Sequence, residues 1–141
     1  MKILFATDGS ACALAALDRL IERLPWFRDT VDIVLLHVHS ALPYKSAAAW
    51  VGKESIAKYY EEESAAALRP AEEALRGRGI AYKIEKRIGE PAPTIVAAAQ
   101  EGHFDLIAMG TQGHTALAQL MLGSVAQKVI AAASLPVLIL R

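Results

Sequence analysis

The chain has 141 residues, 54% of them hydrophobic and 21% charged, with 15 basic residues balancing 15 acidic ones. This composition is typical of one globular domain and excludes a disordered or low-complexity chain. The balanced charge provides no field that would draw the chain onto nucleic acid or an anionic membrane. Charged residues also interrupt every apolar stretch before the roughly 18 to 20 residues of a membrane span.

The N-terminal residues and the cysteine content both bear on the cellular compartment. Residues 1–8 lack the apolar region and the cleavage site of a secretory signal. Cys12 is the only cysteine, so no intramolecular disulfide can form, as is usual in a reducing compartment. We therefore expect a cytoplasmic protein.

The first half of the chain alternates between strand and helix patterns. An apolar run over residues 2–7 predicts a strand, and residues 8–10 after it combine a turn former with a helix cap. Leucines at helical spacing predict a helix over residues 10–24, ended by Pro25. A second strand over residues 31–38 is apolar at most positions, as expected when helices cover both faces of a sheet.

A loop and a long helix complete this half. Residues 39–52 show no clear periodicity and are typical of a loop, after which a helix runs to about residue 78. Pro70 falls inside that helix and either kinks it or restarts it as a first-turn proline. One or two helical pieces are therefore expected.

The second half continues the alternation. Residues 82–88 alternate between apolar and charged side chains, which predicts a half-polar strand at an edge of the sheet. Residues 89–93 predict a loop, residues 94–101 a short helix, and Gly102 its C-terminal cap. The last predicted elements are a strand at 106–109, a helix from Ser124 to about residue 133, and a strand at 137–140.

The order of these elements predicts the fold class. The helical connections are long enough for parallel crossovers, so residues 1–141 are expected to form a single doubly wound α/β domain. In such sheets the ligand lies outside the carboxyl ends of the strands, where the direction of winding reverses.

Two predicted strand ends carry residues suited to a nucleotide. The first strand ends at Asp8, and the fourth at Gly110 and Gly113. A carboxylate can accept hydrogen bonds from ribose hydroxyls, and glycines let backbone amides approach phosphate oxygens. If the two strands are neighbours, both features face one crevice.

A second phosphate-binding feature precedes the last helix. Gly123 and Ser124 follow a nine-residue stretch, and Ser124 is expected to be the N-cap. Unpaired amides and the positive end of the helix dipole make this helix start a suitable phosphate cradle. It is not a P-loop, because no Lys follows Gly123.

Taken together, the glycines resemble a known pattern. Gly110, two residues, Gly113, nine residues and then Gly123-Ser124 is similar to the nucleotide-binding pattern of the universal stress protein family. Residues 2–10, the segment 89–92 followed downstream by 105–107, and the segment 136–139 resemble the same family in the same order. The resemblance implies a five-stranded parallel sheet of order 3-2-1-4-5, Rossmann-like and related to the adenine nucleotide alpha hydrolases, that binds ATP with or without Mg²⁺.

The resemblance also implies a role for each matching residue. Asp8 would contact the ribose and Gly110 would lie near it. Adenine would meet the Val38 backbone, and Met109 would line the adenine pocket. The phosphates would be held by Gly113, Gly123, Ser124 and Val125.

Three positions qualify that pattern. Many relatives have Arg in place of Gln112 and a hydroxyl residue in place of Ala126, so this chain lacks one charge and one phosphate donor. His114 could add a hydrogen bond to phosphate, although a solvent-facing loop histidine is the favoured reading.

The final strand bears on partners. Val137–Leu140 is uncharged, and an edge of this kind needs a cover. The family resemblance implies a homodimer in which the two last strands meet across a two-fold axis, with the downstream protein partner undefined.

Three functions remain open from the sequence. The leading hypothesis is an ATP-binding stress-response or signalling protein whose nucleotide occupancy alters its dimer or its affinity for a partner. The alternatives are a slow ATP-hydrolysing or adenylate-handling enzyme and a structural dimer that binds no nucleotide. No general base paired to a nucleophile is evident, so rapid turnover is not expected.

One further pair of residues suggests a metal site, but the sequence supplies no third ligand for it. His37 and His39 are two apart in an extended segment and could share a face. No third ligand stands at a supporting spacing, so we expect no metal.

Overall fold

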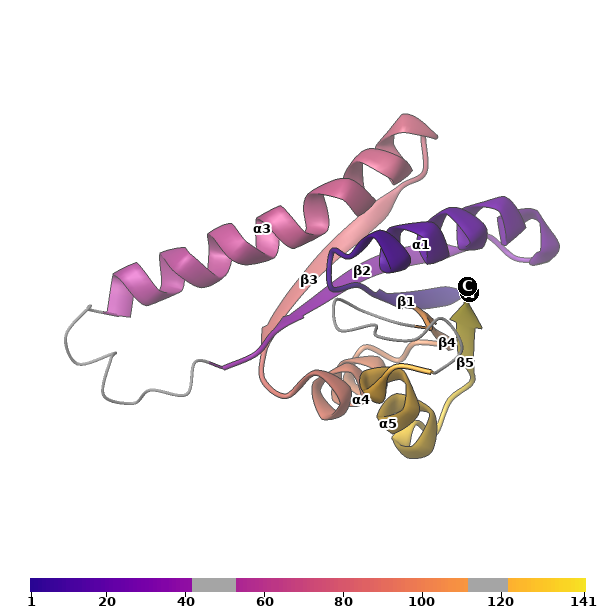
Figure 1. Cartoon of the computed structure of the whole chain (residues 1–141). Helices are drawn as coiled ribbons and strands as arrows, with labels where there is room; N and C mark the ends of the chain where they lie inside the picture. The colour runs from indigo at the N-terminus through magenta and orange to yellow at the C-terminus, as the bar shows by residue number, and fades with distance from the viewer. Residues whose placement is uncertain (42–52, 112–121) are drawn as a thin grey trace.

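The computed structural model describes residues 1–41, 53–111 and 122–141 (Figure 1). The strands are β1 (Lys2–Ala6), β2 (Asp32–His39), β3 (Tyr82–Ile88), β4 (Leu106–Gly110) and β5 (Val137–Leu140). The helices are α1 (Ala11–Arg23), the 3-10 turn η1 (Leu24–Trp26), α3 (Lys53–Gly77), α4 (Pro91–Glu101) and α5 (Ser124–Ala132).

The five strands form one parallel sheet of order β3-β2-β1-β4-β5, which confirms the predicted fold class and topology. β1 lies at the centre, where Ile3, Leu4 and Phe5 are fully buried. β3 lies at an edge, as its charged alternation predicts. β1 and β4 are neighbours in the sheet, so their ends lie side by side. This is the arrangement that the predicted crevice between the first and fourth strands depends on.

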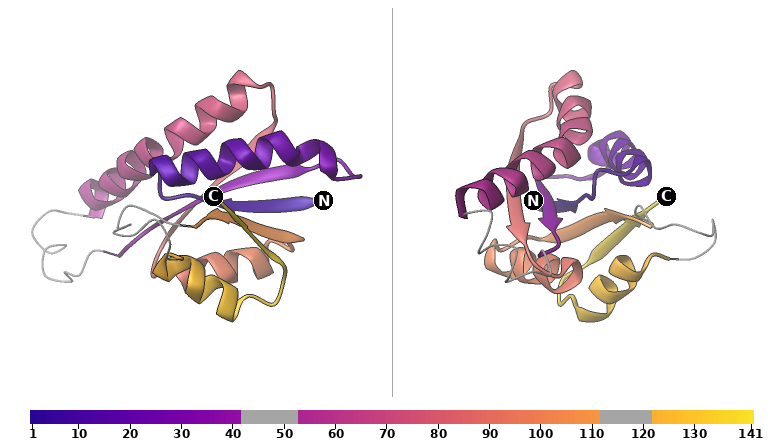
Figure 2. Two further views of the ribbon diagram at one scale, coloured as in Figure 1. Left: turned by 45° about the vertical axis from the view of Figure 1, so that its right-hand side comes forward. Right: turned by 60° about the vertical axis from the view of Figure 1, so that its left-hand side comes forward.

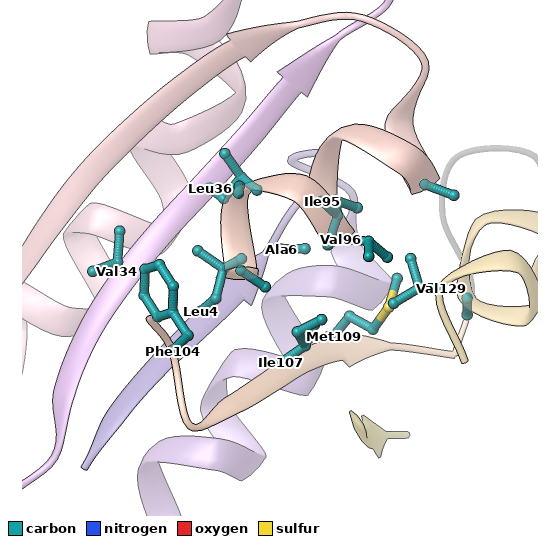
Figure 3. Close-up of a cluster of buried hydrophobic side chains, with 14 residues drawn as sticks. Leu4, Ala6, Val34, Leu36, Ile95, Val96, Phe104, Ile107, Met109 and Val129 are labelled. Carbon is teal, nitrogen blue, oxygen red and sulfur yellow. The ribbon is translucent and has the colours of Figure 1, made fainter. Parts of the chain in front are cut away.

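Helices cover both faces of the sheet (Figure 2). α1 and α3 pack on one face over Ile3 and Phe5, and α4 and α5 pack on the other over Leu4 and Ala6. Figure 3 shows the cluster on the α4 and α5 side. Because successive strand residues point to opposite faces, each central strand contributes to both cores. Burial of one such Leu or Phe contributes about 1.5–3 kcal/mol.

Three features of the helices refine or correct the predictions: the continuity of one helix and the start of two others. α3 runs unbroken through Pro70, so one helix, rather than two, is observed. α4 begins at Pro91 and not at residue 94, because Glu90 is its N-cap and the proline takes the first helical turn, where no amide partner is lost. α5 has Gly123 as its N-cap, and Ser124 is its first helical residue, so the predicted Ser124 cap is wrong.

None of the helices in the described part of the chain is both long and apolar enough to cross a bilayer.

Candidate functional site

A cavity of about 360 Å³ opens at the carboxyl ends of β1, β2 and β4. Its walls are completed by the first turns of α1, α4 and α5. Most of the residues predicted from the sequence line it: Asp8, Val38, Met109, Gly110, Gly123, Ser124 and Val125. The remaining two, Gly113 and His114, lie outside the described residues.

The turn between β1 and α1 presents Asp8 to the cavity through a series of short-range hydrogen bonds. The Gly9 amide donates to Thr7 Oγ1 over 3.1 Å, and the Ser10 amide donates to Asp8 Oδ1 over 3.0 Å. Ser10 Oγ in turn accepts from the Ala13 amide over 3.2 Å and caps α1, as predicted. The half-buried Asp8 carboxylate therefore belongs to a turn whose shape its own side chain helps to fix.

Gly9 allows this turn to lie against α3. Its φ of +79° is in the left-handed region, and a Cβ built there would lie 2.8 Å from the Ala67 Cα and carbonyl oxygen. Both the backbone conformation and the approach of α3 therefore require glycine. The Asp8 turn is thus held between β1 and α3.

The opposite wall is the start of α5. The first helical hydrogen bond runs from the Gln127 amide to the Gly123 carbonyl over 3.0 Å. The amides of the three preceding residues, Ser124, Val125 and Ala126, consequently have no carbonyl partner within the helix, and all three residues line the cavity. A negatively charged group placed here would meet backbone donors and the positive end of the helix dipole.

The inner part of the cavity is apolar. Leu36 and Val38 of β2, Ile95 of α4 and Met109 of β4 line it. Leu36 and Met109 are nearly inaccessible, whereas Val38 is half-buried at the end of its strand. These side chains suit a flat, weakly polar ring, with the carboxylate and the helix start on the more polar side.

Gly110 provides close packing between β4 and α1. A Cβ at this position would lie 3.4 Å from the Cys12 carbonyl oxygen and 3.5 Å from both the Ala13 Cα and the Ala16 Cβ. The substituent would point at α1, which is the face opposite Met109 on this strand. Space beside α1, rather than a strained backbone, is what this glycine supplies.

Charge at the cavity is sparse. Asp8 is the only charged residue among the described residues that line it. On α5, Lys128 Nζ lies 3.0 Å from Glu90 Oε1, in an exposed ion pair with the residue that caps α4, and neither residue lines the cavity. Attraction for an anion here therefore comes mainly from the start of α5.

Sequence comparison decides the family. A model of the universal stress protein family matches residues 1–141. The chain belongs to the universal stress protein family. A universal stress protein of Methanocaldococcus jannaschii is 34% identical over 140 residues, a match that covers 99% of this chain and 81% of the relative.

Solved universal stress proteins share the fold and include nucleotide complexes. One, determined in complex with cAMP, is 26% identical with a TM-score of 0.68, and the match covers 100% of this chain and 97% of the other. Another, from Archaeoglobus fulgidus and in complex with dAMP, is 25% identical with a TM-score of 0.62, covering 100% of this chain and 98% of the other. Both complexes hold an adenine nucleotide.

Several residues that no sequence motif marks also line the cavity of this universal stress protein. Thr7, Ser40 and Thr111 add polar atoms at the strand ends, and Ile95 adds an apolar wall from α4. Ser40 has a signal in the sequence, because it continues the alternation of Leu36 and Val38 along β2. Ile95 has none, since its position depends on how α4 packs on the sheet.

His37 and His39 both act as hydrogen-bond donors to backbone carbonyls. His37 Nδ1 lies 3.0 Å from the Thr7 carbonyl oxygen, and His39 Nδ1 lies 2.8 Å from that of Ser40. Within the described residues no group of three or more His, Cys, Asp and Glu side chains could hold a metal ion.

Proposed function

We propose that this universal stress protein binds an adenine nucleotide in the cavity at the ends of β1, β2 and β4, with ATP as its ligand. One observation carries the proposal: an apolar slot, a carboxylate and the amides of a helix start, which have no carbonyl partner within the helix, line a single cavity. The cAMP and dAMP complexes of related proteins support adenine as the shared part of the ligand. Nucleotide occupancy would then alter partner interactions during a stress response.

Different residues of the cavity would bind the adenine, the ribose and the phosphates of the nucleotide. Adenine lies among Val38, Ile95 and Met109, with its polar edge toward the backbone at the end of β2. The ribose faces Asp8, whose carboxylate accepts from a hydroxyl. The phosphates face the amides of Ser124 and Val125, where the dipole of α5 favours negative charge.

A divalent cation would accompany the nucleotide rather than wait in a protein site. The described lining offers no Lys or Arg to balance a triphosphate, and Asp8 is its only carboxylate. Mg²⁺ is commonly bound through one or two carboxylates together with substrate phosphates, and one carboxylate fits that pattern. The ion would neutralise phosphate charge, and the protein would supply few of its ligands.

Two measurements test nucleotide binding. Mass spectrometry of small molecules released from freshly purified, acid-denatured protein is expected to detect an adenine nucleotide. Calorimetric titration with ATP, AMP and GTP, each with and without Mg²⁺, is expected to give heat with the adenine nucleotides and little with GTP. Absence of both heat and thermal stabilisation with every adenine nucleotide refutes the proposal.

We also propose a homodimer formed through β5. The Ile107 amide donates to the Pro136 carbonyl and the Thr111 amide to the Leu140 carbonyl, so alternate peptide groups of β5 face β4. The peptide groups of Val137 and Ile139 then face the free edge.

Ile139→Pro removes an outward amide, whereas Ile139→Ala loses the same side-chain packing and keeps the amide. Sedimentation at micromolar concentration should show a dimer for the wild type and Ile139→Ala only, and a wild-type monomer would exclude this interface.

A further inference from the structure

His37 lies directly behind the nucleotide cavity, on the other face of β2. Leu36 and Val38, its neighbours in the strand, line the cavity, and successive residues of a strand point to opposite faces. His37 is therefore on the α1 and α3 side of the sheet, where it is 8% exposed. A buried imidazole in this position needs a hydrogen-bond partner.

That partner belongs to the cavity wall. His37 Nδ1 lies 3.0 Å from the carbonyl oxygen of Thr7, a residue that lines the cavity and precedes Asp8. A carbonyl oxygen only accepts, so Nδ1 carries the proton and donates. The bond links residues 30 apart in sequence and joins β2 to the last residue before the Asp8 turn.

The bond also marks where the ladder between β1 and β2 ends. The Thr7 amide still donates to the Leu36 carbonyl over 2.9 Å, as in a continuing parallel ladder. On the other side of β2, the Gly89 amide donates to the His39 carbonyl over 2.9 Å. Because peptide groups alternate between the two neighbours of a strand, the peptide of Val38 points toward β1, where the Thr7 carbonyl would be its next partner. The imidazole of His37 holds that carbonyl instead.

We propose that His37 is a positioning residue for the nucleotide. By holding the Thr7 carbonyl on the α3 side of the sheet, it leaves the Val38 peptide directed at the adenine part of the cavity and fixes the start of the Asp8 turn. This role rests on the proposed nucleotide site. His37 itself would contact no atom of the ligand. His39 lies on the same face, but its bond to the adjacent Ser40 carbonyl is local.

Substitutions that move the donor test the role of Nδ1. Asn carries its amide nitrogen on Cγ, near the place of Nδ1, whereas Gln carries it one carbon further along the side chain. We expect His37→Asn to keep ATP affinity within about threefold of wild type, and His37→Gln and His37→Leu to lose about tenfold, the worth of one well-placed hydrogen bond. Ile33→Val is the matched control, since Ile33 lies buried on the same face at the other end of β2.

A second readout requires no nucleotide. Amide hydrogen exchange of the ligand-free protein should accelerate at Gly9 and Ser10 in His37→Gln and His37→Leu, and stay as in wild type in His37→Asn and Ile33→Val. Unchanged exchange in His37→Leu, or equal losses of affinity in the Asn and Leu variants, overturns the positioning role. If the wild type binds no nucleotide, the proposed function fails, and the exchange pattern still decides whether His37 fixes the turn.

Discussion

The Gly123 amide donates a hydrogen bond to the Thr111 carbonyl oxygen over 2.7 Å. Thr111 follows β4 and Gly123 caps α5, so the bond ties the residue after β4 to the start of α5, and both residues line the cavity. The Thr111 amide meanwhile donates to the Leu140 carbonyl of β5 over 3.1 Å. A phosphate contact from the Gly123 amide, which the sequence pattern implies, would have to replace an existing bond. The amides that follow it in α5 carry no such bond within the helix.

Ser124→Pro tests those helical amides directly. Proline is favoured at the first helical position, and the N-cap Gly123 already has the extended conformation, φ −61° and ψ 152°, that a residue before proline prefers. The variant therefore removes one amide while α5 stays intact. We expect ATP affinity measured by calorimetry to fall about tenfold with little change in stability.

Ser124→Ala is the matched control for that variant. It removes the exposed hydroxyl and keeps the amide, so ATP affinity should remain within about threefold of wild type. Equal losses in the two variants would show that the side chain, and not the backbone, contacts the phosphate.

Asp8 has an observed role in the turn and a proposed role toward the ribose, and the two can be separated by substitution. Asp8→Asn retains an oxygen that can accept from the Ser10 amide, so the free energy of unfolding should change by less than about 0.5 kcal/mol, while loss of the charge weakens ATP binding about tenfold. Asp8→Ala loses both roles and should also lower stability by about 1 kcal/mol. Urea denaturation and calorimetry measure the two effects. An Asn variant that binds ATP as tightly as wild type would remove Asp8 from the site.

A comparison of Gly9 with Gly79 distinguishes two reasons why a position needs glycine: a left-handed backbone conformation and a lack of space for a Cβ atom. Both have positive φ, +79° and +67°, but a Cβ would meet the α3 backbone only at Gly9, and no atom within 4 Å at Gly79. Gly79→Ala should therefore cost about 1 kcal/mol of unfolding free energy from backbone conformation alone. Gly9→Ala should cost at least about 2 kcal/mol and weaken ATP binding, because the turn must move away from Ala67. Equal costs in urea denaturation would contradict this account.

Much of the fold could be read from the sequence because the central strands are buried on both faces. Continuous apolar runs such as β1 and β2 cannot be solvated, and the helices between them are long enough for parallel crossovers. The cavity residues at the ends of β1 and β4 could be predicted for the same reason, since adjacent parallel strands end at one edge of the sheet.

The remainder depends on tertiary contacts and on ambiguous local signals. Pro91 suggested a loop, although proline is equally suited to the first helical turn that it occupies in α4. A serine before a helix suggested a cap, but Gly123 takes that position and its amide bonds to Thr111. The bond from His37 to the Thr7 carbonyl joins distant segments, so no local pattern could reveal it.

At the end of α4, the glycine lies one residue before the left-handed position that glycine usually occupies after a helix. The Phe104 amide donates to the Ala99 carbonyl and the His103 amide to the Gln100 carbonyl, which is the Schellman arrangement. His103, with φ +51°, therefore occupies the left-handed position that Gly79 occupies after α3. Gly102 stands one residue earlier, where a Cβ would lie 2.3 Å from Phe104 Cε2.

His103→Gly should therefore raise the free energy of unfolding, by about 0.5–1 kcal/mol, because glycine adopts the left-handed conformation without the steric cost that a side chain imposes. Gly102→Ala is the opposing control and should destabilise the protein, since its methyl group meets the Phe104 ring. Neither residue approaches the cavity, so ATP affinity should be unchanged in a His103→Gly variant that folds. A loss of stability in His103→Gly would mean that the imidazole makes contacts worth more than the backbone strain it imposes.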